Sequence, residues 1–393
     1  MDARILIVAA LALIFVGQAG AGPTLVIVGG GLKPEHEGVY RAVLDRIGPD
    51  GRLGVLPTAS GVPERSGPLT VKDFEQYASP GQRVVLIDIR RDTPERAHAP
   101  SYVDAIASCD AVWFTGGVQS RIVNVFRPNG EDSPAYKAVV GVLERGGVVG
   151  GTSAGAAMMT DPMIFWGNSH EALLLGEVDD VGDFGVAFGR GMGLLPDAVV
   201  DQHFFRRGRL GRLLVACQMT GRSKGFGIGE NCAMVVDLDA MTGRVIGDPG
   251  VLAIELVGRH AVAAEDSAIA AFEARYWPNG ASFSLADEAS EAPIDDAASL
   301  RLVEEALSGS PRSYDGPLVV DVVRAPLPDD YVGFGTDQAF VLRPSEAYAL
   351  ARQAARLSVA KARLDRAGKA DRSGPLVDRL PDRWVVSQET LDD

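Results

Sequence analysis

One serine stands in a pentapeptide whose spacing suits nucleophilic chemistry. Residues 151–155 read Gly-Thr-Ser-Ala-Gly and follow the apolar pair Val148-Val149. The G-x-S-x-G pattern is typical of a strand-to-helix turn that holds a serine in a strained conformation with its hydroxyl exposed. Its glycines are required because the bend brings neighbouring backbone too close for a Cβ. A plain strand–turn–helix could use the same residues, so the prediction that Ser153 is a nucleophile depends on the rest of the chain.

A serine hydroxyl is a weak nucleophile at neutral pH and requires a base within hydrogen-bond reach. The chain contains five histidines, and only His203 lies in an apolar, strand-like run, residues 198–205, with polar neighbours on both sides. A core histidine without a chemical role is the usual interpretation of such a position. The basic cluster that follows favours a functional role instead. We predict that His203 is the general base.

This basic cluster places four arginines within seven residues: Arg206, Arg207, Arg209 and Arg212. The chain has a formal charge of −14, so the cluster contrasts with its surroundings. A solvated helix face is the ordinary explanation for a run of charges. However, Gly208 and Gly211 are poor helix formers placed between the arginines, and they indicate that the backbone approaches another group closely. Guanidinium groups bind carboxylates in a fork, so we favour a binding site for a substrate carboxylate.

A third residue should hold the imidazole in the correct tautomer and stabilise its cation. Glu230 follows the glycine-rich run 225–229 at an expected strand end. Asp201 is the alternative because it is close to His203 in sequence. Residues two apart on an extended strand point the same way at a spacing of ~7 Å, which is awkward for a direct bond to the ring. We therefore expect Glu230 to be the acid.

The elements that must position these residues alternate between strands and helices. Strands are expected at 24–31, 52–57, 83–89, 110–115 and 148–150, and helices at 35–47, 74–77, 103–107 and 133–145. The strands are apolar without polar alternation, which indicates burial on both faces. The pattern predicts an α/β fold with a mainly parallel, doubly wound sheet and helices on both faces.

Ligands bind to such sheets beyond the carboxyl ends of the strands. Three loops are therefore expected to meet there: Gly29–Gly31, Gly116–Gln119 and Gly151–Gly155. The first of these is glycine-rich like a nucleotide-binding turn, but it lacks the G-x-G-x-x-G spacing, so we do not expect a dinucleotide site.

The remainder of the chain is less regular. Residues 163–193 are expected to form a loop or hairpin excursion over the sheet, residues 206–219 to lead into a helix, and 233–238 to form a strand. A closing β-hairpin is expected at 244–258. We assign the catalytic domain to residues 22–260 and a C-terminal extension of unknown role to 261–393. Within this extension, 262–275 and 347–367 are expected to be helical.

Composition sets further limits. Residues 1–21 combine Arg4, an apolar run over 5–16 and small residues at 19–21, which predicts a cleaved signal peptide and a secreted or periplasmic protein; an uncleaved N-terminal helix is the alternative. The acidic charge argues against nucleic-acid binding. Cys109, Cys217 and Cys232 have no metal-type spacing, and we expect neither metal nor cofactor. Buried free thiols are favoured at positions 109 and 217, although one disulfide would also fit.

Three blocks together resemble the cyanophycinase family of serine peptidases, a branch that also contains the aspartyl dipeptidases (peptidase E). The blocks are residues 151–156, Phe114-Thr115-Gly116-Gly117 with Gln119, and Asp201-Gln202-His203-Phe204 with the arginines that follow. The resemblance covers roughly residues 24–258. It implies a flavodoxin-like fold similar to that of class I glutamine amidotransferases, with serine in place of their cysteine. It also implies hydrolysis of cyanophycin, an aspartate polymer with arginine branches, to β-Asp-Arg dipeptides.

By position, the resemblance implies roles for individual residues. Ser153 would be the nucleophile, His203 the base and Glu230 its partner, while the N–H groups of Gly117 and Ala154 would form the oxyanion hole. Substrate would be bound by Gln119, Asp201, Gln202, Arg207, Arg209 and Arg212. The resemblance also suggests a homodimer, although no heptad or apolar patch in the sequence requires one. Two alternatives remain: a dipeptidase or isoaspartyl peptidase acting on short acidic peptides, and a non-catalytic peptide-binding homologue.

Overall fold

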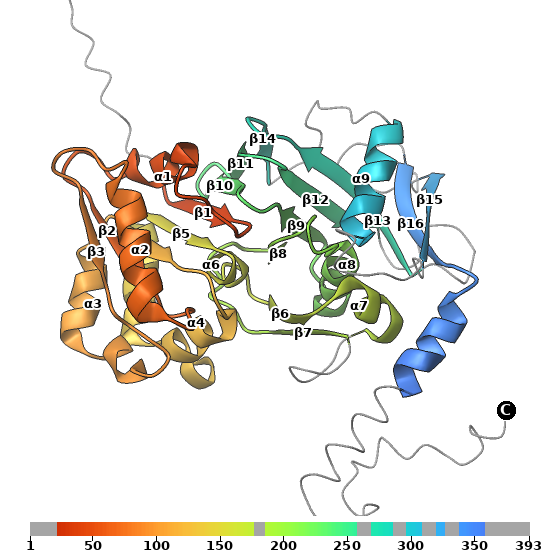
Figure 1. Cartoon of the computed structure of the whole chain (residues 1–393), viewed down its shortest axis with the longest axis horizontal. Coiled ribbons are helices and arrows are strands. Elements are labelled where there is room, and N and C mark those ends of the chain that lie inside the picture. The colour runs from red at the N-terminus through yellow and green to blue at the C-terminus, as the bar shows by residue number, and fades with distance from the viewer. Residues whose placement is uncertain are drawn as a thin grey trace, which may run out of the picture.

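The computed structural model describes residues 22–176, 185–257, 269–285, 296–308, 320–326 and 338–357 (Figure 1). The predicted signal peptide, residues 1–21, lies outside the described residues. The described chain forms two large sheets and a two-stranded ribbon, with helices packed around them.

The first sheet has eight strands in the order β14-β11-β10-β1-β5-β4-β2-β3. Five neighbouring strands pair in parallel, in the order β1, β5, β4, β2 and β3. The other three, β10, β11 and β14, each pair antiparallel with their neighbours. The predicted α/β class with a mainly parallel sheet is therefore confirmed. The strands are β1 (Thr24–Val28), β2 (Arg52–Leu56), β3 (Arg83–Leu86), β4 (Ala111–Phe114), β5 (Val148–Thr152), β10 (Ala233–Asp237), β11 (Thr242–Ile246) and β14 (Ser282–Ser284).

Helices cover both faces of this sheet. Successive side chains of each strand point to opposite faces, and because both sets are apolar, both faces need a cover of helices. In β1, Leu25 and Ile27 join the core cluster beneath α3 to α6, whereas Val26 and Val28 join the cluster beneath α1 and α2. Ser133 caps α5 by accepting a hydrogen bond from the backbone N–H of Tyr136, with proline next in the first turn, as predicted. The helices are α1 (Glu37–Leu44), α2 (Pro63–Glu75), α3 (Pro100–Ala107), α4 (Gln119–Phe126), α5 (Pro134–Glu144) and α6 (Ala154–Ala157), with short 3₁₀ helices at Pro94–Ala97 and Pro128–Gly130.

The second sheet has six strands in the order β15-β16-β13-β12-β9-β8, and only β8 and β9 pair in parallel. One face shares the core of the first sheet, while the other packs on α8 (Leu210–Thr220). Its strands are β8 (Ala198–Asp201), β9 (Lys224–Ile228), β12 (Val251–Leu256), β13 (Ala270–Trp277), β15 (Val320–Pro326) and β16 (Gln338–Pro344), and α9 (Asp296–Ser308) lies against α8.

The excursion over residues 163–193 contains the predicted hairpin. Strands β6 (Met163–Gly167) and β7 (Val186–Gly189) pair antiparallel. Between them lies α7 (Ser169–Leu175), which the sequence analysis did not anticipate; Asn168 caps this helix by accepting from the N–H of Glu171. Because α7 packs on α8, the excursion joins the hydrophobic core between the second sheet and α8, which we call the second core.

The expected closing hairpin at 244–258 is wrong. Strand β11 pairs with β10, so that Ile246 lies opposite Ala233, whereas β12 pairs with β9, so that Val251 lies opposite Ile228. The glycine turn between them sends the chain from the first sheet to the second. Strand β11 thus pairs with the strand just before it, β10, whereas β12 pairs with the more distant β9, which local turn residues do not reveal.

The expected helix at 262–275 is also wrong over its described part, because residues 270–277 form β13. Phe272 and Ala274 on one face of this strand enter the second core, and strand pairing overrides the helix propensity of alanine there. The expected helix at 347–367 is present over 348–357, and its remainder lies outside the described residues. Strands from both sides of residue 260 share the second sheet; the domain boundary itself stays a prediction.

All three cysteines are buried and free of disulfides, which confirms the interpretation of Cys109 and Cys217 as buried thiols. Burial raises the pKa of Cys109 to about 11, so this thiol stays protonated at neutral pH. Among the residues that the structure describes, none of the helices has the length and apolar character needed to cross a bilayer.

Candidate active site

The turn at Ser153 has the strained geometry that its glycines predict. Ser153 links β5 to α6 with φ 55° and ψ −106°, and its backbone N–H donates to Val28 O at 3.0 Å. A Cβ at residue 151 would lie 2.6 Å from Gly155 O, and a Cβ at residue 155 would lie 2.4 Å from Phe114 O. Only glycine fits at either position, and the serine is held at the carboxyl end of a central strand.

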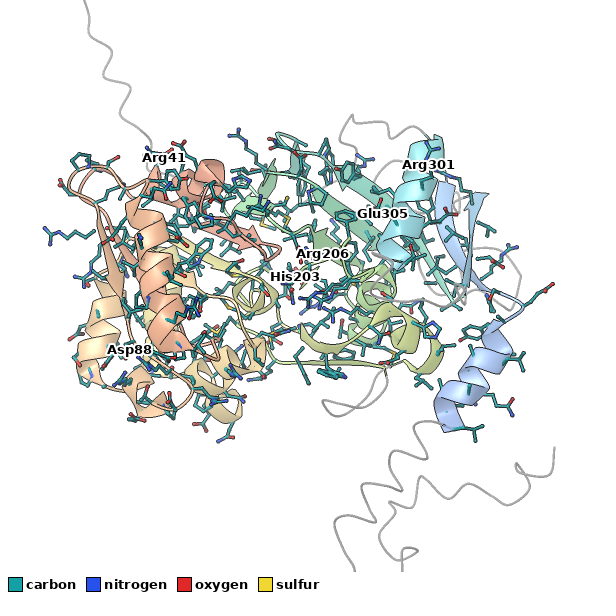
Figure 2. The ribbon with its side chains drawn as sticks, in the orientation of Figure 1. Arg41, Asp88, His203, Arg206, Arg301 and Glu305 are labelled. Atoms are coloured by element: carbon teal, nitrogen blue, oxygen red, sulfur yellow. The ribbon has the colours of Figure 1, made fainter. Side chains whose placement is uncertain are left out.

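The imidazole of His203 reaches Ser153 from the second sheet. Strand β8 ends at Asp201, and His203 follows in the left-handed region with φ 52°. Its backbone N–H donates to Gly29 O at 2.6 Å, which joins the two sheets at this point. The Nε2 atom lies 3.0 Å from Ser153 Oγ. Figure 2 shows His203 in the middle of the molecule, between the two sheets.

Glu230 completes the contact chain from the segment between β9 and β10. Its Oε1 lies 2.5 Å from His203 Nδ1. A carboxylate beside Nδ1 favours the tautomer that carries its proton there, which leaves Nε2 to accept the serine hydroxyl proton. Of the two acids weighed from the sequence, Glu230 is therefore the one that contacts the imidazole, whereas Asp201 faces the arginines.

The backbone of Gly29–Gly31 packs against the side chains of His203 and Glu230. Gly30 has φ 97°, and a Cβ there would lie 2.4 Å from His203 Cε1 and Nε2. A Cβ at Gly31 would lie 3.4 Å from Glu230 Cβ. The carbonyl of Gly30 also accepts from the N–H of Asn231 at 2.7 Å. The glycines after β1 are thus required because two functional side chains pack directly on their backbone.

The electrostatic environment leaves His203 neutral and Glu230 charged. Burial lowers the pKa of His203 from its ordinary 6.5, and the guanidinium groups of Arg207 and Arg209 lower it further, whereas the hydrogen bond to Glu230 opposes them. Burial acts to raise the pKa of Glu230, but the hydrogen bonds from His203 and Arg206 lower it overall. At neutral pH the imidazole is therefore able to take a proton, and the carboxylate is able to stabilise the resulting cation.

The loop after β4 runs beside the serine. A Cβ at Gly116 would lie 3.4 Å from Ser153 Cβ, so the peptide between Gly116 and Gly117 is adjacent to the turn. Gly117 has φ 145°, and a Cβ there would lie 2.0 Å from Ala59 O. Ala154 is the first residue of α6; the N–H groups of Ala156 and Ala157 donate to Ser153 O, and the N–H of Ala154 stands before them with no acceptor within the helix. The N–H groups of Gly117 and Ala154 suit the predicted oxyanion hole, and that role stays a prediction.

Three charged residues expected to bind substrate contact one another, and their substrate-binding role stays a prediction. The carboxylate of Asp201 is 1% exposed and accepts from Arg212 Nε at 2.7 Å and Nη2 at 2.5 Å. Arg209 donates to Asp201 Oδ1 at 3.4 Å and to the carbonyl of Gln202. Burial, then repulsion from Arg212, lowers the pKa of Arg209 to about 9. This buried ion-pair cluster ties β8 to the start of α8.

The other residues predicted to bind substrate differ in exposure and in the hydrogen bonds that their side chains make within the protein. Gln119 is buried and donates through Nε2 to Ile164 O at 2.8 Å, which ties α4 to β6. Gln202 is 5% exposed, and its Oε1 has no hydrogen-bond partner in the described part of the chain. Arg207 is exposed at the surface; partial burial lowers the pKa of its guanidinium, and the charge of Glu230 opposes that shift. Arg207 is thus the best placed of the predicted arginines to meet a carboxylate from outside.

A contact that the sequence analysis missed is made by Arg206, whose Nη1 donates to Glu230 Oε2 at 2.8 Å. The arginine cluster was the signal, but sequence spacing could not show which arginine reaches the acid. No group of three or more His, Cys, Asp or Glu side chains with metal-binding geometry occurs within the described ranges.

Replacing Gly30 tests whether the position of the His203 ring depends on its close packing against the Gly30 backbone. In Gly30→Ala we expect the new methyl to displace the ring, and a misplacement of ~1 Å lowers the hydrolytic rate about 10²-fold. The matched control is Gly48→Ala, since Gly48 also has a positive φ of 71° but its Cβ would meet nothing within 4 Å. Both variants should lose about 1 kcal/mol of stability from backbone strain, measured by urea unfolding. A Gly30→Ala enzyme with the wild-type rate would contradict the assignment.

Replacing Asp201 separates a structural role from substrate binding. Asp201→Asn leaves Arg212 buried without its anion, so we expect the free energy of unfolding to fall by about 3–5 kcal/mol. The control is Asp45→Asn, which removes an exposed carboxylate 3.6 Å from Arg41 and should change stability by less than about 1 kcal/mol. Urea denaturation measures both. An unchanged stability of Asp201→Asn with a raised KM would instead assign Asp201 to the substrate.

Comparison with known proteins places the chain in a family. No protein-family model matches the chain. A cyanophycinase from Nostoc is 31% identical over 240 residues, which cover 60% of this chain and 74% of the relative. A cyanophycinase from Geminocystis herdmanii is 30% identical over 252 residues, covering 61% and 86%. The crystal structure of a peptidase from an acI-B1 actinobacterium aligns with a TM-score of 0.45 at 17% identity, covering 68% of this chain and 99% of that one. The chain belongs to the cyanophycinase family of serine-type peptidases.

Proposed function

We propose that the protein is an exported serine exopeptidase that hydrolyses cyanophycin to β-Asp-Arg dipeptides. The observation that carries the proposal is the continuous contact from Ser153 Oγ through the imidazole of His203 to the carboxylate of Glu230. These three groups come from three separate segments. A nucleophile, a neutral base and a charged acid in this order form the arrangement that activates a serine for acyl transfer.

The chemistry follows from the contacts. Ser153 Oγ attacks the scissile carbonyl while Nε2 of His203 takes its proton, and Glu230 stabilises the imidazolium. The N–H groups of Gly117 and Ala154 donate to the oxyanion. His203 then returns the proton to the leaving amine, which leaves an acyl group on Ser153. Water, deprotonated by the same imidazole, hydrolyses this ester and regenerates the serine.

Charge supports an acidic peptide as the substrate class. Arg207 is exposed, and its guanidinium, on which the charge of Glu230 acts, suits a substrate carboxylate. The relatives named above are cyanophycinases, and cyanophycin carries an aspartate backbone with arginine branches. Gln202 Oε1, which has no hydrogen-bond partner among the described residues, is an acceptor suited to a donor such as a substrate guanidinium.

The test is incubation of purified protein with insoluble cyanophycin, with release of β-Asp-Arg followed by chromatography. Solubilisation that is lost in Ser153→Ala supports the proposal. Turnover restricted to short isoaspartyl or aspartyl peptides would replace it with a dipeptidase. Binding of the polymer without any turnover would indicate a non-catalytic homologue.

Export and assembly belong to the same proposal. The apolar run over residues 5–16 supports export, and the N-terminal sequence of protein recovered from the native host would show cleavage near residue 21. The family resemblance supports a homodimer, and analytical ultracentrifugation of the mature chain distinguishes a dimer of twice its mass from a monomer.

A further inference from the structure

Glu230 is held at both of its oxygens. Oε1 lies 2.5 Å from His203 Nδ1, and Oε2 accepts from Arg206 Nη1 at 2.8 Å. Two partners on different oxygens fix the rotation of a carboxylate about its terminal bond, because turning the group would break both contacts. The backbone of Gly31 lies close on a further side, where a Cβ would be 3.5 Å from Oε2.

The Arg206 contact differs in kind from the buried ion pairs of Arg209 and Arg212. The side chain of Arg206 is 70% exposed, whereas that of Glu230 is 22% exposed. An exposed ion pair contributes little to stability, so this contact is not needed to hold the fold together. Figure 2 shows Arg206 next to His203, at the start of the segment that leads into α8. Its position makes the contact relevant to the imidazole.

The charges around the pair define what Arg206 does. His203 and Arg206 contact Glu230 directly, and Arg207 and Arg209 act on the charge of His203. The hydrogen bond and the positive charge of Arg206 at Oε2 partly compensate the negative charge of Glu230. Without Arg206, Glu230 would interact more strongly with the imidazolium, and the imidazole would keep its proton to a higher pH.

We propose that Arg206 is a positioning residue for the hydrolytic reaction: it orients the Glu230 carboxylate toward His203 and limits how strongly that carboxylate holds a proton on the imidazole. The inference rests on the proposed function only in that His203 is the base for Ser153. It assigns to one exposed arginine a role that the family resemblance gives to none of its neighbours.

The experiment uses the full chain and measures the rate at which a fluorophosphonate probe labels Ser153 between pH 4.5 and 9. Labelling requires the activated serine but not the natural substrate, so the test stands even if cyanophycin is not hydrolysed. The variants are Arg206→Gln and Arg206→Lys. The matched control is Arg41→Gln, which removes the same charge from an exposed ion pair on α1, 3.3 Å from Glu37.

For the wild type, the acid limb of the profile should lie below pH 6.5, the ordinary pKa of histidine, because burial lowers the pKa of His203. In Arg206→Gln we expect this limb to move up by about half a pH unit and the plateau rate to fall about fivefold. In Arg206→Lys, the acid limb of the labelling-rate profile should stay near its wild-type pH, and the plateau labelling rate should lie between those of Arg206→Gln and the wild type. Arg41→Gln should match the wild type.

A folded Arg206→Gln enzyme with an unchanged acid limb and plateau would overturn the proposal. So would a variant that changes only KM for a hydrolysed peptide, because Arg206 would then contact substrate rather than Glu230. Failure of the wild type to be labelled at all would instead overturn the proposed function. Thermal unfolding of each variant checks that a lost rate does not reflect a lost fold.

Discussion

Ser153→Ala is expected to lower kcat for peptide hydrolysis by a factor on the order of 10⁴ to 10⁶. The methyl group cannot form the acyl-enzyme, so only binding and the oxyanion donors remain to assist water. Because Ser153 is partly buried and its hydroxyl contacts only His203 among the hydrogen bonds of the described chain, the fold should be retained. Release of the dipeptide product measures kcat, and fluorophosphonate labelling should disappear in parallel.

The control for this variant is Ser108→Ala. Ser108 is exposed at the end of α3, and its hydroxyl donates to Ala105 O at 2.9 Å, so its loss should leave kcat unchanged. Ser153→Ala protein that keeps more than about a hundredth of the wild-type rate would place the nucleophile elsewhere.

Glu230→Gln is expected to lower kcat by about 10⁴. The amide group can donate to Nδ1, which would place the imidazole proton on Nε2 and block acceptance of the serine proton. It also removes the charge that stabilises the imidazolium. The hydrogen bond to Glu230 raises the pKa of His203, so the acid limb of any residual activity should move to lower pH, opposite to the movement expected for Arg206→Gln. A profile of kcat against pH measures both effects.

Glu75→Gln is the matched control, because Glu75 is an exposed carboxylate at the end of α2. Its replacement should leave the rate and the pH profile unchanged. If Glu230→Gln instead retained most of the wild-type rate while Asp201→Asn abolished activity without unfolding the protein, the acid would be Asp201.

Local patterns in the sequence were sufficient for several elements. The apolar run of β1 and the capped start of α5 are specified by neighbouring residues, since burial on both faces and N-terminal capping are properties of a few adjacent positions. The turn around Ser153 is of the same kind, because close backbone packing there admits only glycine. The spacing of side chains on a strand favours Glu230 over Asp201 as the acid, and in the structure Glu230 lies against the imidazole.

Tertiary structure decided which partner each residue meets. Asp201 and Arg212 are 11 residues apart and read from the sequence as two groups open to substrate, yet they form a buried pair. Arg206 and Arg207 are adjacent, but only Arg206 donates a hydrogen bond to Glu230 within the part of the chain that the structure describes. The glycines after β1 lack the spacing of a nucleotide-binding turn, and the side chains that pack on them, His203 after β8 and Glu230 between β9 and β10, come from far along the chain.

The same distinction explains the wrong elements. An alanine-rich stretch favours a helix in isolation, but β13 is fixed by its register with β12 and β16. The residues around Gly247 suit a hairpin, but β11 and β12 belong to different sheets. The sequence by itself determined which residues could be a nucleophile, base and acid, because residue type and local backbone limits are read directly from it. Only the tertiary structure decided which of these groups touch, because pairing between distant strands depends on burial summed over the whole chain.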